Sequence, residues 1–144
     1  MYDKILIPTD GSTEADKGAK HGVDLAAAVG AEVHGLYVIE EGGNPWLSEP
    51  MDDQMERAKS YGEEITGEVG DLAADAGVDF VSAVEAGPSV AQEIVSYAEE
   101  EDVDLIVMGS GYRGTIGGVL GGTAEKVLRS TTVPVTTLRR GDIE

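Results

Sequence analysis

Residues 105–123 read LIVMGSGYRGTIGGVLGGT, an apolar run followed by a loop in which seven of the fourteen residues from Gly109 to Gly122 are glycine. The next residues, 124–130 (AEKVLRS), have the composition of a helix. Glycine lets a backbone approach a ligand closely, and the free N–H groups at a helix N-terminus bind anions. This order of strand, glycine-rich loop and helix predicts a phosphate-binding loop in an α/β fold.

Short apolar runs alternate with amphipathic stretches along the rest of the chain. We expect strands at residues 4–9, 32–39, 78–84, 104–108 and 133–138, helices at 13–29, 51–77, from Val90 onward and at 123–130, and a loop at 40–50. Such alternation implies βαβ units with right-handed crossovers. The nearly unbroken apolar strands agree, since parallel strands are buried on both faces. We therefore expect one α/β domain over residues 1–144.

The periodicity of the first helix predicts which of its residues face the sheet. Its inward positions are expected to be Ala15, Ala19, Val23, Ala26 and Ala27. Gly30 follows the last apolar residue, as is typical of a helix end.

The composition is strongly acidic, with 28 Asp and Glu against 10 Lys and Arg and a formal net charge of −18. Two interpretations stay open: a very soluble surface, or adaptation to a salt-rich cytoplasm that screens self-repulsion. The acidity argues against nucleic acid as a partner, because phosphate contacts need a basic face. No apolar run approaches the roughly 18 residues of a membrane span, and the N-terminus lacks a signal-peptide pattern, so we expect a cytoplasmic protein.

The charge is unevenly distributed. Residues 1–108 hold 25 acidic and 5 basic residues, whereas residues 109–144 hold 3 acidic and 5 basic ones. The glycine-rich loop therefore lies in the part of the chain that is poor in acid, which favours an anionic ligand there. Cysteine is absent, which excludes disulfides and thiol catalysis, and the two histidines lack metal-ligand spacing.

Three segments resemble the universal stress protein family: ILIPTDGS (5–12), DLIVMGS (104–110) and GGTAEKVLRSTTVPV (121–135). Nucleotide-binding members of that family carry Gly, two residues, Gly, nine residues and Gly-Ser/Thr after the fourth strand. Gly109, Gly122 and Thr123 match this pattern, and Tyr112 stands where the second glycine is expected. A tyrosine there would be costly at positive φ or could fill the phosphate pocket; alternatively, flanking glycines re-route the loop.

The resemblance implies an adenine-nucleotide site and a particular topology. We expect an open, twisted, Rossmann-like parallel sheet of five strands in the order 3-2-1-4-5, with helices on both faces. The implied nucleotide-binding residues are Pro8, Thr9, Asp10, Val38, Met108, Gly109, Gly111, Arg113, Gly122, Thr123 and Ala124. The implied ligand is ATP, alone or with Mg²⁺, and family members pair through the last strand, which implies a homodimer through Val133, Val135 and Leu138.

Several of these residues also have an ordinary structural interpretation. Asp10 could form an Asx turn that starts the first helix, and Thr123 could cap the last helix. Val38 could be core, and Arg113 could be a solvated surface residue. Trp46, the only tryptophan, is either a lid over a site, an anchor for a partner or a packed loop residue.

Catalytic motifs are missing from the chain. It has no GxxxxGK[ST] or GxSxG motif, and its GxGxxG letters at residues 109–114 lack the acidic residue that dinucleotide binding requires about 20 residues later. We therefore expect a nucleotide-binding regulatory protein of stress survival, with at most slow hydrolysis or autophosphorylation. Two alternatives stay open: a dimeric scaffold that binds no nucleotide, and an adenylyl-transferring enzyme.

Overall fold

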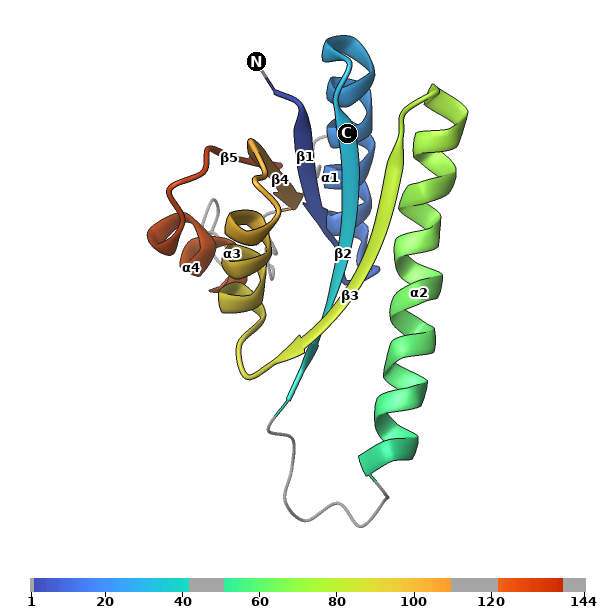
Figure 1. Ribbon diagram of the computed structural model, residues 1–144, viewed down its shortest axis with the longest axis vertical. Coiled ribbons are helices and arrows are strands. Elements are labelled where there is room, and N and C mark those ends of the chain that lie inside the picture. Colours follow the sequence, from blue (N-terminus) through green and yellow to red (C-terminus); the bar gives the residue numbers. More distant parts are fainter. Residues whose placement is uncertain (1, 42–50, 110–121, 139–144) are drawn as a thin grey trace.

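The computed structural model describes residues 2–41, 51–109 and 122–138, and the side chains of residues 51 and 52 are outside that description. Strands and helices alternate along the chain, as Figure 1 shows. Their bounds are β1 Lys4–Pro8, α1 Thr13–Val29, β2 Glu32–Glu40, α2 Met51–Ala76, β3 Phe80–Gly87, α3 Val90–Glu100, β4 Leu105–Gly109, α4 Gly122–Ser130 and β5 Val135–Leu138.

The five strands form one parallel sheet in the order β3-β2-β1-β4-β5, which confirms the expected topology. The central strand β1 pairs on one side with β2, where Ile5 is opposite Val33, and on the other with β4, where Ile5 is opposite Leu105. The strands that follow β1 in the sequence are therefore added first on one side of it, as β2 and β3, and then on its other side, as β4 and β5. This reversal places the switch point between β1 and β4, where ligands of such sheets bind.

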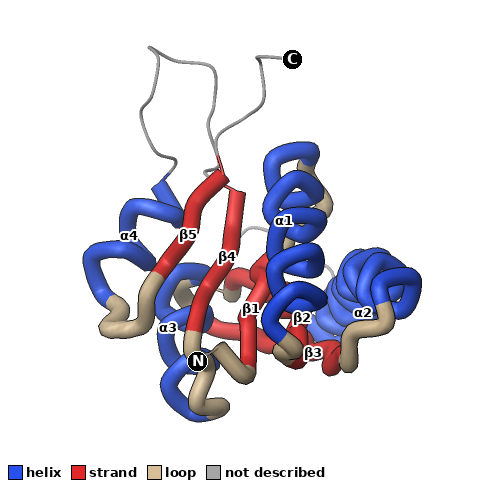
Figure 2. The backbone as a smooth tube through the Cα atoms, turned by 90° about the horizontal axis from the view of Figure 1, so that it is seen from above, coloured by secondary structure: helices blue, strands red, loops and turns tan. Residues whose placement is uncertain are grey.

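Helices cover both faces of the sheet, with α1 and α2 on one face and α3 and α4 on the other (Figure 2). Side chains alternate between the faces along each strand. In β1, Ile5 and Ile7 enter the core beneath α1 and α2, whereas Leu6 enters the core beneath α3 and α4. Both cores consist mainly of buried aliphatic side chains, and the core beneath α3 and α4 also contains Tyr97 and Met108.

α1 is capped at both ends, and Gly30 ends it as predicted. The Oγ of Ser12 accepts from the backbone N–H of Ala15 (3.2 Å), which satisfies one of the unpaired donors of the first turn. At the other end, Gly30 has φ +77° and donates its N–H to the carbonyl of Ala26 (2.8 Å). A left-handed residue of this kind is the usual helix terminator.

The inward face of α1 differs from the prediction at one position. Ala15, Ala19, Val23 and Ala26 are buried as expected, but Ala27 is exposed. Two glycines on the same helix, Gly18 and Gly22, are buried instead. Glycine carries no apolar side chain, so a periodicity based on hydrophobicity misses these positions.

Some predicted strand bounds are wrong by a few residues. β3 begins at Phe80 rather than 78, because the N–H of Val78 still donates to the carbonyl of Ala73 (2.8 Å) at the end of α2. It continues to Gly87 because its pairing with β2 extends to Glu40, which also shortens the predicted 40–50 loop. β5 is confined to Val135–Leu138 and is an edge strand, a position compatible with the neighbouring Pro134.

No helix in the described part of the chain is long and apolar enough to cross a membrane.

Candidate functional site

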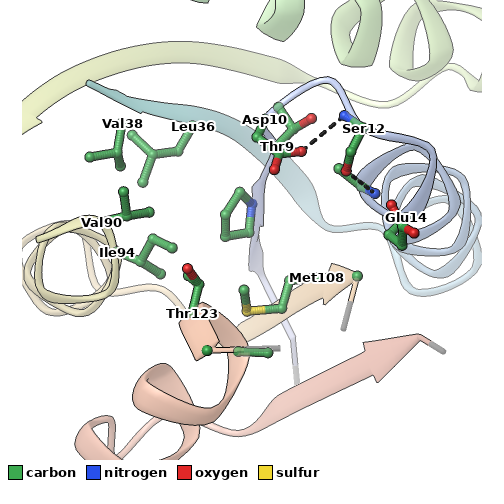
Figure 3. Close-up of a pocket in the computed structure, with 15 residues that line it drawn as sticks. Thr9, Asp10, Ser12, Glu14, Leu36, Val38, Val90, Ile94, Met108 and Thr123 are labelled. Carbon is green, nitrogen blue, oxygen red and sulfur yellow. Dashed lines mark hydrogen bonds between the residues drawn. The ribbon is translucent and has the colours of Figure 1, made fainter. Parts of the chain in front are cut away.

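A pocket opens at the carboxyl ends of β1, β2 and β4, where the chain reverses direction across the sheet (Figure 3). Its walls also come from the first turns of α1, α3 and α4. The lining residues are Pro8, Thr9, Asp10, Ser12, Glu14, Ala15, Leu36, Val38, Val90, Ile94, Met108, Gly109, Gly122, Thr123 and Ala124. This is where an open parallel sheet binds its ligands.

One wall is a rigid polar turn between β1 and α1. The N–H of Thr9 extends the sheet by donating to the carbonyl of Leu36 (2.9 Å), and the Oγ1 of Thr9 accepts from the N–H of Gly11 (3.2 Å). The Oδ1 of Asp10 accepts from the N–H of Ser12 (2.9 Å). Asp10 therefore forms the predicted Asx turn and also lines the pocket, and its role toward a nucleotide stays a prediction.

Gly11 lets this turn fit beneath α2. Its φ of +82° is in the region that glycine adopts without strain. A Cβ at this position would also lie 2.7 Å from Cδ1 of Ile65 in α2. The turn that presents Thr9 and Asp10 is thus held from outside by packing as well as from inside by hydrogen bonds.

The opposite wall is apolar and comes from β2 and α3. In Figure 3, Val38 and Leu36 lie above Val90 and Ile94 on the side of the pocket away from α1. Val38 is only partly buried, so the pocket exposes an aliphatic surface. Branched aliphatic side chains on two facing elements form a slot that suits a flat, weakly polar ring.

The backbone of Val38 adds hydrogen-bonding capacity to this apolar wall. Leu36 accepts from Thr9 and so directs its backbone groups toward β1. Backbone groups alternate sides along a strand, so those of Val38 point the same way. The pairing of β1 with β2 ends at Pro8 opposite Leu36, so the N–H and C=O of Val38 face the pocket beyond the end of β1.

The third wall is the N-terminus of α4. This helix begins at Gly122, so Thr123 is in its first turn with an exposed side chain, and the buried Ala124 lies beside it. The first N–H groups of a helix have no partner within the helix, and the helix dipole makes this end positive. The arrangement is suitable for an anionic group.

Gly109 at the end of β4 is required by the close approach of α1. A Cβ at Gly109 would overlap the carbonyl oxygen of Glu14, and a Cβ at Gly18 would lie 2.8 Å from the backbone nitrogen of Gly109. The first turns of α1 therefore pack directly on the end of β4. This contact gives a structural reason for the first glycine of the expected motif, independent of any ligand.

The polar side chains that line the described pocket are hydroxyls and carboxylates. They include no Lys, Arg, His or Cys, and no group of three or more Asp, Glu or His side chains among the described residues could hold a metal ion. Near the pocket, burial raises the pKa of Tyr37, with Tyr61 and Asp10 adding to the shift. A phenol of raised pKa stays protonated at neutral pH.

The structure brings together most of the residues predicted from the sequence. Those that line the pocket are Pro8, Thr9, Asp10, Val38, Met108, Gly109, Gly122, Thr123 and Ala124. Gly111, Tyr112, Arg113 and Trp46 lie outside the described residues. The predicted pairing residues Val135 and Leu138 are half-buried on the edge strand β5, and Val133 is half-buried just before it.

Sequence reasoning missed six lining residues: Ser12, Glu14, Ala15, Leu36, Val90 and Ile94. A signal was available for two of them, because α3 begins where β3 ends and its first turn must therefore lie at the same edge as the glycine-rich loop. Hydrophobic periodicity alone could not identify Val90 and Ile94 as lining residues, because it does not separate the wall of a pocket from a core.

Comparison with known proteins agrees with this architecture. The model of the Universal stress protein family matches residues 1–139. The chain is 34% identical to universal stress protein MJ0531 of Methanocaldococcus jannaschii, covering 97% of this chain and 84% of that protein. It is 32% identical to universal stress protein YxiE of Bacillus subtilis, covering 96% and 100% of the two chains.

A solved structure shares the fold closely. The structure of MJ0577, also from Methanocaldococcus jannaschii, superimposes with a TM-score of 0.84 at 29% identity and covers 97% of each chain. The family match spans nearly the whole chain, and the fold is shared with a solved relative. This chain belongs to the universal stress protein family.

Proposed function

We propose that the pocket binds an adenine nucleotide, ATP in the first instance, and that the chain acts as a nucleotide-binding regulatory protein in stress survival. The observation that carries the proposal is the pairing, in one pocket, of an apolar slot with a helix N-terminus. Val38, Val90 and Ile94 form the slot on one side, and Gly122 and Thr123 begin α4 on another. A base and a phosphate need these two environments at the same time.

The three walls suggest a pose for the nucleotide. The base would enter the slot, where the N–H and C=O of Val38 match the adjacent acceptor and donor on the edge of adenine. The ribose hydroxyls would lie near Thr9 and Asp10, and the phosphates near Gly109, Thr123 and the N-terminus of α4. The free oxygen atoms of Asp10 could also help to hold Mg²⁺ against the phosphates.

Relatives with this fold support an adenine ligand. One solved universal stress protein, 24% identical with a TM-score of 0.74, was determined in complex with cAMP. Another, from Archaeoglobus fulgidus, 20% identical with a TM-score of 0.70, was determined in complex with dAMP.

Calorimetric titration with ATP and Mg²⁺ in molar KCl tests the proposal. We expect Val38→Trp, which fills the slot, to weaken binding at least about tenfold, because the base loses its cavity. Val81→Trp is the matched control, since Val81 is an exposed valine on β3 outside the pocket. Absence of binding heat at millimolar ATP would favour the scaffold alternative, and product formation at enzymatic turnover would favour an adenylyl-transferring enzyme.

Tyr112 is the position at which this chain departs from the family motif. If its side chain obstructs the phosphates, Tyr112→Gly should raise the affinity for ATP in the same titration. An unchanged affinity would show that the loop accommodates tyrosine.

We also infer that the protein is a homodimer that pairs through β5. An edge strand presents unpaired backbone groups, and Val135 and Leu138 on β5 are only half-buried in the isolated chain. Sedimentation equilibrium should give twice the mass of the chain, and Val135→Arg should shift it toward the monomer.

A further inference from the structure

Thr9 carries a buried hydroxyl whose hydrogen has no acceptor in the described part of the chain. The residue is 8% exposed and lines the pocket. Its Oγ1 accepts from the N–H of Gly11 (3.2 Å), and no described residue accepts a hydrogen bond from it. A buried donor without a partner is unfavourable. Because this hydroxyl lines a pocket, an atom of a ligand can be its acceptor.

The backbone around Thr9 fixes the position of this hydroxyl. The N–H of Thr9 donates to the carbonyl of Leu36 (2.9 Å), and the N–H of Gly11 holds its Oγ1. Gly11 in turn lies close to Ile65 of α2, since an added Cβ would be 2.7 Å from Cδ1 of that residue. A donor that is already held in place loses little conformational entropy when a ligand binds, so its hydrogen bond contributes more to affinity.

The sheet order places Thr9 between the two ends of the proposed ligand. β1 is flanked by β2, whose Val38 lines the base slot, and by β4, whose Gly109 begins the glycine-rich loop. The part of a nucleotide that lies between the base and the phosphates is the sugar. The carboxyl end of β1 therefore faces the sugar, and Figure 3 shows Thr9 and Asp10 together on this wall.

Thr9 and Asp10 together match the hydrogen-bonding pattern of a sugar hydroxyl. Thr9 offers a donor. Asp10 offers an acceptor, because in the described part of the structure only its Oδ1 is engaged, by the N–H of Ser12 (2.9 Å). A hydroxyl group both donates and accepts hydrogen bonds, and the cis-diol of ribose has two such groups on neighbouring carbons. A deoxyribose lacks one of them.

We propose that the Thr9 hydroxyl donates to an oxygen of the ribose diol and makes the pocket prefer ribonucleotides to their deoxy analogues, an inference that rests on the proposed nucleotide site. A ligand without that oxygen leaves the buried donor unpaired and therefore binds more weakly. Base and phosphates are the same in a ribonucleotide and its deoxy analogue. A comparison of the two ligands consequently isolates the contact with the sugar.

The test uses four proteins and three ligands. The proteins are the wild type, Thr9→Val, which keeps the shape but not the hydroxyl, Thr9→Ser, which restores the hydroxyl, and Thr131→Val. Thr131 is the matched control, because its Oγ1 accepts from the N–H of Val133 (3.0 Å) in the same local pattern outside the pocket. The ligands are ATP, 2′-deoxyATP and 3′-deoxyATP, each with excess Mg²⁺. Calorimetry in molar KCl gives the affinities.

We expect the wild type to bind at least one of the deoxy analogues about three- to tenfold more weakly than ATP, which is the effect of one hydrogen bond. In Thr9→Val, binding of ATP should weaken and the preference for ATP over that analogue should disappear. Thr9→Ser should keep the preference. Thr131→Val should change each affinity by less than about twofold, because distant sites act independently.

Two results would overturn the inference while leaving the proposed function intact. One is equal affinity of the wild type for all three ligands, a result that needs no variant. The other is a Thr9→Val variant that keeps the wild-type preference, which would assign recognition of the hydroxyl to another residue. Thr9→Ala takes the place of Thr9→Val if urea unfolding shows that the valine variant is not folded. If the wild type binds none of the three ligands, the proposed function itself fails, and this inference fails with it.

Discussion

The two faces of the sheet are packed in different ways. Beneath α1 and α2, helices approach the sheet through glycine: a Cβ at Gly18 would lie 2.8 Å from the backbone of β4, and one at Gly70 would lie 2.9 Å from the ring of Phe80. Such contacts bring backbones close together and leave no room for added atoms. On this face, the space between helix and sheet limits the size of the side chains that the helices can carry.

Beneath α3 and α4, specific side chains hold the layers together. His34 on β2 is 3% exposed, and its Nδ1 is 2.7 Å from the hydroxyl of Tyr97 on α3. Its Nε2 is 2.8 Å from a carboxylate oxygen of Glu32. This polar chain crosses an otherwise aliphatic core, and the same face contributes the apolar wall of the pocket. Substitutions should therefore change the stability of the protein through side-chain volume on the face covered by α1 and α2. On the face covered by α3 and α4 they should change it through hydrogen bonding.

The largest effect is expected from Gly18→Ala. The added methyl meets backbone atoms of Met108 and Gly109, which cannot rotate away, so the free energy of unfolding should fall by about 3 kcal/mol. Gly67→Ala is the matched control, because its Cβ would meet nothing within 4 Å on α2, and it should stabilise by about 0.5–1 kcal/mol. Urea unfolding measures both; equal effects would show that the contact between α1 and β4 is not tight.

A smaller loss is expected from Tyr97→Phe, which removes one hydroxyl and leaves a ring nitrogen of buried His34 without its partner. The cost should be about 1–2 kcal/mol. Thr66→Val is the comparison on the other face, where the Oγ1 of Thr66 is 2.7 Å from the Oγ of Ser82. Ser82 is exposed, so water can replace the bond and the loss should stay below about 1 kcal/mol. A larger loss of unfolding free energy for Thr66→Val than for Tyr97→Phe would contradict the proposed difference between the two faces.

Unfolding at alkaline pH provides a second test of the buried hydroxyl of Tyr97. Burial, with further contributions from Glu101, Glu85 and Glu32, raises the pKa of Tyr97 to about 12 from the usual 10.0. The folded-state pKa is the higher one, so this contribution to stability is complete below pH 10 and is lost as the pH rises from 10 to about 12. The difference in unfolding free energy between the wild type and Tyr97→Phe should therefore narrow over that range. A constant difference would contradict a buried, hydrogen-bonded phenol.

The smallest effect is expected on the outer surface of α2, whose sequence has eight acidic and two basic residues. Glu68 is exposed, and exposed Glu64 and Asp71 are one turn away from it. Glu68→Lys replaces repulsion by attraction and should stabilise by about 0.5 kcal/mol at low salt. In 1 M KCl, where charges are screened beyond about 3 Å, the gain should vanish.

The same salt series tests the proposal that the acidic composition is an adaptation to a salt-rich cytoplasm. The wild-type unfolding midpoint should fall on dilution from molar KCl, because self-repulsion is then unscreened. An unchanged midpoint would contradict the adaptation and favour plain solubility. The unfolding midpoint of the Glu68→Lys variant should fall less than that of the wild type over the same dilution.

The alternation of strands and helices could be predicted from the sequence because its determinants are local, whereas the strand order was implied by the family resemblance. Apolar runs, glycine at Gly30 and serine before α1 and α3 mark where elements begin and end, and parallel crossovers restrict the rest. The predictions are wrong where contacts between residues far apart in the sequence determine strand bounds or burial. Pairing with β2 sets the bounds of β3, and Gly18 and Gly22 are buried because of neighbours that no periodicity reveals.

The candidate site was predictable only in part, for a related reason. Residues at strand ends, such as Asp10 and Gly109, could be named because parallel strands bring their carboxyl ends to one edge. Glu14 could not, because its position in the pocket depends on how closely α1 approaches β4. An acidic residue in a first helical turn is ordinary by composition, and only the packing of α1 on Gly109 places Glu14 in the wall of the pocket.

The contact between Gly18 and Gly109 has a mechanical consequence. Two backbones that touch without intervening side chains leave no rotamers to adjust, so the first turns of α1 and the end of β4 must move as one body. The wall formed by Val90 and Ile94 rests on side chains, whose rotamers can change. A ligand that enters the pocket would contact a stiff wall on the side of α1 and β4 and a more adaptable wall on the side of α3. Differences in ligand size should therefore be accommodated by small displacements of α3.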